Sequence, residues 1–183
     1  MLLDAALAAC AEEGAQVEKI TLAGMEIRDC VGCVPCFEKC VTGDTTWEVT
    51  DRLLDADGII LASPTYQGMM SGLLKSFLDR AIYIGRKHRA PSKVAGHSGL
   101  LKDKVGASIA VGASSGMQFV NLEHVMWFLK NQMLVATGER SLYLGLAATA
   151  RDRGEVKCDK VAMEGARELG RRMVELIRLT GTG

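Results

Sequence analysis

Residues 58–72 read Gly58-Ile-Ile-Leu-Ala-Ser-Pro-Thr-Tyr-Gln-Gly-Met-Met-Ser-Gly72, and this stretch decides the fold class. The uninterrupted apolar run Ile59–Ala62 is typical of a strand that is buried on both faces of a sheet. Pro64 and Gly68 shape the polar loop that follows, and Ser71 is a suitable N-cap for the next helix. We expect the buried face of that helix to consist of Leu74, Phe77, Leu78, Ala81 and Ile82.

The same alternation of strand and helix patterns continues on both sides of this stretch. Further helices are expected around 3–8, 47–56, 118–132 and 161–177, and further strands at 17–22, 105–111 and 142–146. Strands that alternate with helices of this length imply right-handed crossovers and a parallel sheet with helices on both faces. The chain is therefore predicted to be one α/β domain over residues 1–183.

Composition excludes several classes of function. Lys and Arg together number 22, as do Asp and Glu, so the net charge is zero and the basic excess of a nucleic-acid binder is missing. The longest apolar runs are far too short to span a bilayer, which predicts no membrane segment. The N-terminus lacks the basic start of a secretory signal, and we expect a cytoplasmic protein.

Four of the six cysteines lie in one short polar stretch, Cys30-Val-Gly-Cys33-Val-Pro-Cys36-Phe-Glu-Lys-Cys40, within a loop expected at 23–46. Two-residue gaps let successive thiolates turn toward one centre, and such spacing suits the corners of a [4Fe–4S] cluster. Zinc is the alternative, because thiolate spacing separates zinc from iron–sulfur sites poorly. Cys10 and Cys158 stand apart and are interpreted as small buried or surface thiols.

Two loops follow expected strand ends, which is where ligands bind in open α/β sheets. In the first, Ala62–Gly72, backbone N–H groups can meet the heteroatoms of a flavin, and Tyr66 can lie against its ring. The second, Val111–Gln118, is a glycine-rich turn. Each loop alone also fits an ordinary strand-to-helix connection, but the two together with the cysteine loop favour a flavin site.

At these residues the chain resembles the iron–sulfur flavoprotein family, within the NADPH-dependent FMN reductases of the flavodoxin-like superfamily. The resemblance rests on Ser63-Pro-Thr-Tyr-x-Gly68, the following Met70-Ser-Gly-x-Leu-Lys-x-Phe-x-Asp-Arg80, Leu101-Lys-x-Lys-Val-Gly106 and the Val111-Gly112 loop with Gln118. It covers residues 1 to about 150, and the cysteine run narrows it to the iron–sulfur branch.

The resemblance implies a doubly wound, three-layer α/β/α fold with five parallel strands. FMN would bind at the strand ends, in a homodimer or homotetramer that places clusters near the flavins of neighbouring subunits. It implies a metal site of Cys30, Cys33, Cys36 and Cys40. The implied flavin contacts are Ser63, Pro64, Thr65, Tyr66, Gln67, Gly68, Met69, Gly112, Ala113, Ser114, Ser115, Gly116 and Gln118.

Three departures from the family pattern matter. The last cysteine gap is shorter than usual, which makes Cys40 the least secure ligand. Gly116-Met117 replaces a glycine pair, so Met117 is expected to crowd or reshape that wall of the flavin site. The sequence begins within the first helix, so the first strand and its phosphate loop are expected to be missing, although strand 1 is central in such a sheet.

The leading hypothesis for function is an oxidoreductase or electron carrier that moves electrons between FMN and the cluster. Ferredoxin or NAD(P)H would be the donor, and a small molecule or a protein the acceptor. One alternative is an NAD(P)H-dependent FMN or quinone reductase without a cluster. The other is a non-enzymatic, metal-binding interaction protein that has lost FMN. No general acid or base is nominated, and His88, His97 and His124 are interpreted as exposed loop or helix residues.

Overall fold

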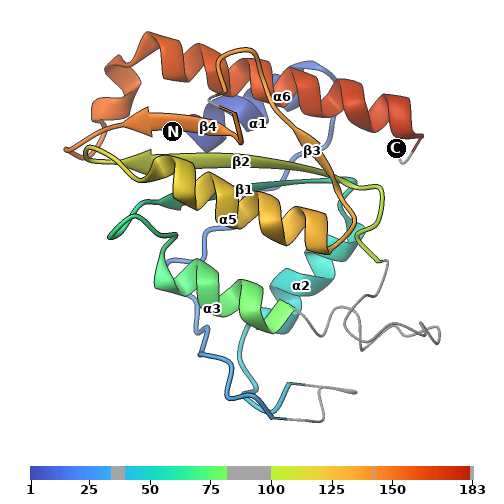
Figure 1. Cartoon of the computed structure of the whole chain (residues 1–183). Coiled ribbons are helices and arrows are strands. Elements are labelled where there is room, and N and C mark those ends of the chain that lie inside the picture. Colours follow the sequence, from blue (N-terminus) through green and yellow to red (C-terminus); the bar gives the residue numbers. More distant parts are fainter. Residues whose placement is uncertain (34–39, 82–99, 142, 182–183) are drawn as a thin grey trace.

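One parallel sheet lies between two layers of helices in the computed structural model, which describes residues 1–33, 40–81, 100–141 and 143–181 (Figure 1). Strand β1 (Gly58–Pro64) pairs with β2 (Val105–Gly112), with Gly58 opposite Val105. The other edge of β2 is shared by two short strands. β3 (Leu134–Ala136) pairs with its first half and β4 (Leu146–Thr149) with its second half. The central strand β2 is therefore buried along almost its whole length.

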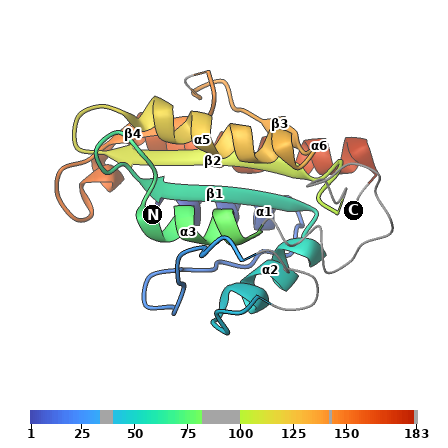
Figure 2. The same cartoon turned by 60° about the horizontal axis from the view of Figure 1, so that its bottom comes forward.

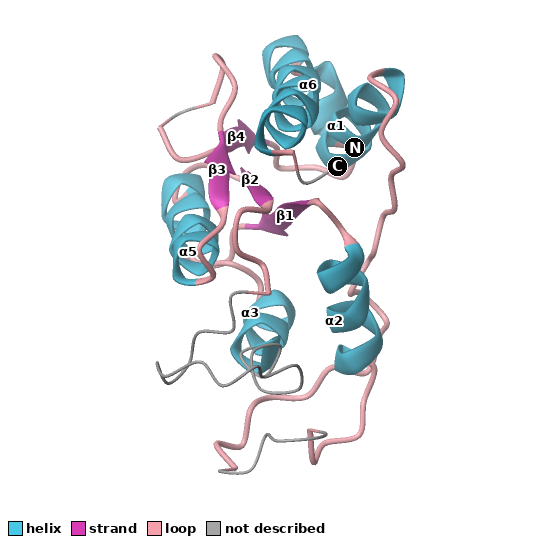
Figure 3. Cartoon of the chain, turned by 90° about the vertical axis from the view of Figure 1, so that its right-hand side faces the viewer, coloured by secondary structure: helices cyan, strands magenta, loops and turns pink. Residues whose placement is uncertain are grey.

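Each face of the sheet is covered by its own group of helices (Figure 3). Helices α1 (Leu2–Glu12) and α6 (Lys160–Thr180) share a core with Val105, Ala107 and Ile109 of β2. The opposite face is covered by α2 (Thr46–Asp55), α3 (Gly72–Arg80) and α5 (Met117–Lys130). A 3-10 turn (Glu155–Cys158) precedes α6, and no described helix is long and apolar enough to cross a membrane.

Two glycines let the layers approach closely. A Cβ atom at Gly106 of β2 would lie 2.6 Å from the ring of Phe128, and one at Gly170 of α6 would lie 2.2 Å from the carbonyl oxygen of Ala6. Both distances are far below van der Waals contact, so side chains at these positions would force the helices apart. The glycines at 106 and 170 therefore allow α5 to pack closely on β2 and α1 to pack closely on α6.

Most expected elements are found near their predicted positions. The helices around residues 47–56 and 118–132, the strand at 105–111 and the long final helix are confirmed. Ser71 is the N-cap of α3, because its side chain accepts a hydrogen bond from the backbone N–H of Leu74 at 3.3 Å. Leu74, Phe77, Leu78 and Ala81 are buried as expected, while Ile82 lies outside the described residues.

Two strand predictions were wrong in part. Residues 17–22 form no strand, because none of the described strands pairs with them. The strand expected at 142–146 lies later, at Leu146–Thr149, and the short β3 was missed. On its side away from β2, β1 pairs with no strand in the described part of the chain.

The interpretation of His124 as exposed is wrong, while His88 and His97 lie outside the described residues. His124 has no exposed surface, and its Nδ1 lies 2.8 Å from Ser108 Oγ. Ser108 donates its own proton to Asn121 Oδ1 at 2.6 Å, so its oxygen must accept from Nδ1–H. Nε2 is then an unprotonated buried atom without a partner among the residues described.

The pH dependence of stability should report this buried histidine. Burial lowers the pKa of His124 from 6.5 to about 4, so the unfolded chain takes up the proton first as the pH falls. Stability from this group is complete above pH 6.5, and linkage predicts a loss of about 3 kcal/mol between pH 6.5 and 4. Urea unfolding at several pH values should show this slope in the wild type.

A His124→Gln variant is the control, since glutamine does not titrate. Its unfolding free energy should be lower at pH 7 and should fall much less across the same window, because only carboxylates whose pKa the fold lowers, such as Asp44, still contribute near pH 4. Equal pH slopes for the variant and the wild type would show that His124 is not the titrating group.

Candidate functional site

The loops after β1 and β2, predicted from the sequence to bind flavin, lie side by side at one end of the sheet (Figure 2). The backbone N–H of Thr65 donates to the carbonyl of Val111 at 2.7 Å. A Cβ atom at Gly116 would lie 2.8 Å from the Cα of Gly68, so glycines are needed where the loops cross. The structure thus joins the two predicted loops into one surface.

The first loop turns sharply between Tyr66 and Met69. The backbones of these two residues exchange hydrogen bonds of 2.9 and 3.0 Å, and the residues between them, Gln67 and Gly68, have φ angles of 52° and 81°. Two successive positive φ angles define a type I′ turn. The turn leaves the side chains of Tyr66 and Met69 about two-thirds exposed, at 63% and 61%. A flat aromatic and a polarisable thioether are therefore available to a ligand.

Residues beneath the loop have a different role. Ser63 is buried, and its hydroxyl donates to the carbonyl of Pro64 and accepts from the backbone N–H of Ser71 at 2.9 Å. It holds the two ends of the loop together. Thr65 places a buried hydroxyl at the crossing, and this oxygen has no hydrogen-bond partner among the described residues. A buried polar atom without a partner is what a hydrogen-bonding ligand at this surface would satisfy.

The second loop presents Ala113, Ser114, Ser115 and Gln118 to solvent. The expected crowding by Met117 does not occur on this exposed side. Met117 is buried, and its sulfur packs against Gly112, where even a Cβ atom would come within 2.7 Å of it. Helix α5 begins directly after Gly116 with no side-chain cap, so its first N–H groups are offered at the loop.

Sequence reasoning missed one cation beside these loops. Arg151 follows β4, and its Nε lies 3.5 Å from the carbonyl oxygen of Ala113. The neighbouring Ala150 donates to the carbonyl of Gly112 at 2.9 Å. The position directly after a strand end was the available signal, but the predicted strand was misplaced. An exposed guanidinium at this edge suits an anionic group of a ligand.

The predicted metal ligands are described only in part. Cys30 is exposed, Cys33 is half-buried and Cys40 is buried, while Cys36 lies outside the described residues. Within the described ranges, no three metal-ligating side chains come together, and no two cysteines form a disulfide. By chemistry alone, cysteine thiols suit a thiophilic metal. The structure adds a specific environment for Cys40.

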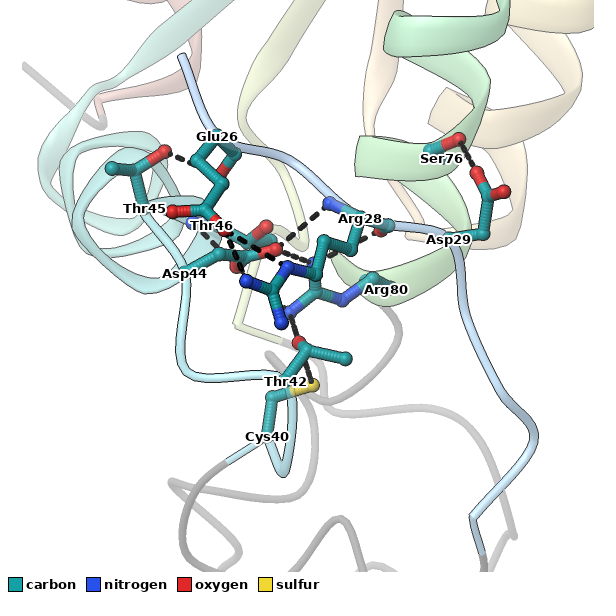
Figure 4. A network of polar contacts seen from close by, with 10 residues as sticks. All are labelled: Glu26, Arg28, Asp29, Cys40, Thr42, Asp44, Thr45, Thr46, Ser76 and Arg80. Atoms are coloured by element: carbon teal, nitrogen blue, oxygen red, sulfur yellow. Dashed lines mark hydrogen bonds and ion pairs between the residues drawn. The ribbon is translucent and has the colours of Figure 1, made fainter.

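A buried ion pair closes the base of the cysteine loop (Figure 4). Arg80, at the end of α3, is 1% exposed and forms a two-pronged contact with Asp44, through Nη1 to Oδ2 and through Nη2 to Oδ1 at 2.9 Å. Burial alone would raise the pKa of the Asp44 carboxyl, but hydrogen bonds led by that from Arg80 lower it well below its usual value. Asp44 is therefore charged at neutral pH.

The same pair ties together the chain on both sides of the four cysteines. Asp44 accepts from the backbone N–H of Arg28 at 2.8 Å and from that of Thr46 at 3.1 Å. Arg80 Nη1 also donates to the carbonyl of Arg28 at 3.0 Å. We call Arg28, Cys40, Thr42, Asp44 and Arg80 the clasp. It joins the segment before Cys30, the segment after Cys40 and the end of α3.

The sulfur of Cys40 is an acceptor in the clasp. Arg80 Nη2 lies 3.1 Å from it, and the two hydrogens of this nitrogen are shared among the sulfur, the hydroxyl of Thr42 and Oδ1 of Asp44. That hydroxyl oxygen lies 3.2 Å from the sulfur, and because it accepts from Arg80, its own proton is free to point at Cys40. Burial would raise the pKa of the thiol, but these contacts outweigh burial and lower it. A thiol that loses its proton more readily suits a metal ligand, because the thiolate is the form that binds a metal.

Neither Asp44 nor Arg80 was predicted as part of the site. Arg80 falls in the last turn of a helix, where a basic residue normally faces solvent and complements the helix dipole. Asp44 lies 36 residues away in a turn-rich loop. Nothing local in the sequence marks the two as partners.

Helix α3 connects the two candidate sites (Figure 1). It begins at Gly72, three residues after the exposed Met69, and ends at Arg80 in the clasp. Its length from Gly72 to Arg80 is about 12 Å at the usual helical rise. Phe77 and Leu78 bury it against the sheet, so the loop after β1 and the cysteine loop are held by one short rigid element.

Comparison with known proteins places this arrangement in a family. The model of the NADPH-dependent FMN reductase family matches residues 1–145. An iron–sulfur flavoprotein of Methanocaldococcus jannaschii is 34% identical over 98% of this chain and 90% of its own length. One from Methanosarcina thermophila is 26% identical over 97% of this chain and 87% of its own length.

Solved structures agree on the fold. An archaeal flavodoxin matches with a TM-score of 0.60 at 12% identity, over 97% of this chain and 88% of its own. A flavone reductase matches with a TM-score of 0.68 at 22% identity, and this chain spans 57% of its length. The flavodoxin-like α/β fold predicted from the sequence is thereby confirmed. With family and relatives matched over most or nearly all of its length, the chain belongs to the NADPH-dependent FMN reductase family, in its iron–sulfur flavoprotein branch.

Proposed function

We propose that this protein is an FMN-dependent oxidoreductase that passes electrons between a flavin on the two joined loops and a [4Fe–4S] cluster on the cysteine loop. Flavins exchange one or two electrons and clusters exchange one, so the pair of groups supplies the electron chemistry. The ligands would be Cys30, Cys33, Cys36 and Cys40. Names of relatives such as "iron-sulfur flavoprotein" support both cofactors.

The observation that carries this proposal is the path of α3. The helix starts beside the loop that presents Tyr66 and ends at the residue that donates to Cys40. A protein that moves electrons between two groups must hold them at a fixed, short separation. A single nine-residue helix would hold the two groups of one chain in this way, in addition to any approach of clusters to flavins of neighbouring subunits.

The chain's own residues would bind and orient the flavin. Tyr66 and Met69 offer exposed apolar surface to the ring system, while Thr65 and the start of α5 offer polar groups to its edge. Arg151 lies where an anionic part of the cofactor could be neutralised.

Metal analysis of protein purified without oxygen tests the cluster. Iron and acid-labile sulfide should each approach about four per chain, as a [4Fe–4S] cluster requires. A Cys33→Ser variant should lose most of the iron, because an alcohol is a poor ligand for iron in a cluster. The control is Cys158→Ser, which changes an exposed cysteine in the 3-10 turn before α6, outside the cysteine loop, and should keep the full iron content. Zinc without sulfide in the wild type would instead favour the reductase that lacks a cluster.

Flavin binding depends on the crossing of the two loops. Gly116→Ala places a Cβ atom 2.8 Å from Gly68 at a φ of +91°, so the loops must separate. We expect the Kd for FMN, measured by quenching of flavin fluorescence, to rise at least about tenfold, which corresponds to roughly 1.4 kcal/mol.

Gly14→Ala, just after α1, is the matched control. It imposes nearly the same backbone strain, at a φ of +87°, but meets nothing within 4 Å. It should leave the Kd close to that of the wild type. Equal affinities for the two variants would contradict a flavin site at the crossing.

We also propose that the protein forms a homodimer or homotetramer and accepts electrons from ferredoxin or NAD(P)H. Helix α5 exposes an apolar stripe of Phe119, Leu122, Met126 and Leu129. Their 3-4-3 spacing reads the same in both directions, so two antiparallel copies could pair Phe119 with Leu129 and Leu122 with Met126, as an isologous contact requires. Sedimentation should give a mass of at least two chains for the wild type and a smaller one for Met126→Glu.

A further inference from the structure

We propose that Arg80 is a positioning residue for the cluster. It holds Cys40 in place before any metal arrives, and its hydrogen bond to the ligand sulfur raises the reduction potential of the cluster. This inference rests on the proposed function, since it concerns a cluster on the four cysteines. It reverses the expectation from the sequence, in which the short final gap made Cys40 the least secure ligand.

The position of Cys40 is fixed without a metal. It is the buried member of the described loop cysteines, and its sulfur accepts from Arg80 Nη2 at 3.1 Å with Thr42 Oγ1 at 3.2 Å. Four residues later, Asp44 is locked to Arg80 and to the backbone of Arg28. Cys30, in contrast, is exposed. A ligand held in this way costs little entropy to bind, so assembly would begin at Cys40 and proceed to the exposed thiols.

The charges of the clasp make it suitable for this role. A lone buried guanidinium would be costly, but Asp44 neutralises it. The pair therefore brings N–H groups to the sulfur without adding net charge. A hydrogen bond to a ligand sulfur stabilises the reduced cluster, which carries the extra negative charge, more than the oxidised one. Removing the bond should make the cluster harder to reduce.

Thr42 gives a second, milder way to disturb the same sulfur. Its hydroxyl accepts from Arg80 and lies within hydrogen-bond distance of Cys40, so Thr42→Val removes one donor to the sulfur and leaves the Arg80–Asp44 pair intact. Thr45 provides the matched control in the same loop. Its hydroxyl donates to the carbonyl of Glu26 at 3.0 Å and not to a sulfur.

The experiment is an anaerobic redox titration of the cluster, followed by its visible and electron paramagnetic resonance spectra at one pH. Iron, sulfide and helix content are measured on each sample. For Arg80→Lys we expect the ratio of reduced to oxidised cluster at a fixed potential to fall roughly tenfold, equivalent to about 59 mV for one electron. Thr42→Val should shift in the same direction by less, and Thr45→Val should match the wild type.

The outcomes separate this inference from the proposed function. Wild-type protein without iron and sulfide would overturn both. A wild-type cluster whose potential is unchanged in Thr42→Val and in Arg80→Lys would overturn this inference alone. If Arg80→Lys fails to fold, the test rests on Thr42→Val. A cluster potential in Thr42→Val equal to that in Thr45→Val would then reject the role of the hydrogen bonds to the sulfur.

Discussion

The buried pair of Asp44 and Arg80 is the constraint on which the cysteine loop depends. Both side chains are almost fully removed from solvent, at 0% and 1% exposed, so neither charge can be left without the other. Breaking such a pair by removing one partner typically costs about 3–5 kcal/mol. Because the carboxylate also holds the backbone of Arg28 and Thr46, the segments on either side of the four cysteines cannot separate without exposing or isolating a charge.

A second constraint acts at the other end of helix α3, where the loops after β1 and β2 meet. The carboxyl ends of β1 and β2 are adjacent because the strands pair in register, and the bond from Thr65 to Val111 continues that pairing past the strands. Glycines at 68 and 116 then let the loops cross. The surface predicted to bind flavin is thus an extension of sheet pairing, whereas the cysteine loop is held by charge. Proteins commonly place binding groups on loops that a rigid scaffold positions. Here backbone pairing positions the loops after β1 and β2, and a buried ion pair positions the cysteine loop.

The elements that could be predicted from the sequence are those with local signals. The apolar run at 59–62, the N-cap Ser71 and the glycine-rich loop at 111–118 each act through neighbours in the chain. Elements that depend on distant partners were missed or misplaced. Residues 17–22 alternate as a strand does, but no described strand pairs with them. The three-residue β3 is too short to show a period. The burial of His124 depends on Ser108 and Asn121, which the fold brings next to it. The burial of Arg80 depends on Asp44, which lies 36 residues away in the sequence.

Helix α3 makes the two constraints act together. Its first turn is capped by Ser71, whose backbone N–H donates to Ser63 in the loop after β1. Its last residue is Arg80, whose guanidinium donates to Cys40. Between these ends the helix is buried against the sheet through Phe77 and Leu78, so it cannot slide without opening the core. A movement of Arg80 in the clasp would therefore require α3 to move, and the other end of α3 lies beside the loop that carries Tyr66. The separation of the two sites is fixed by the number of residues in one helix, and changing that number would alter it by about 1.5 Å for each residue added.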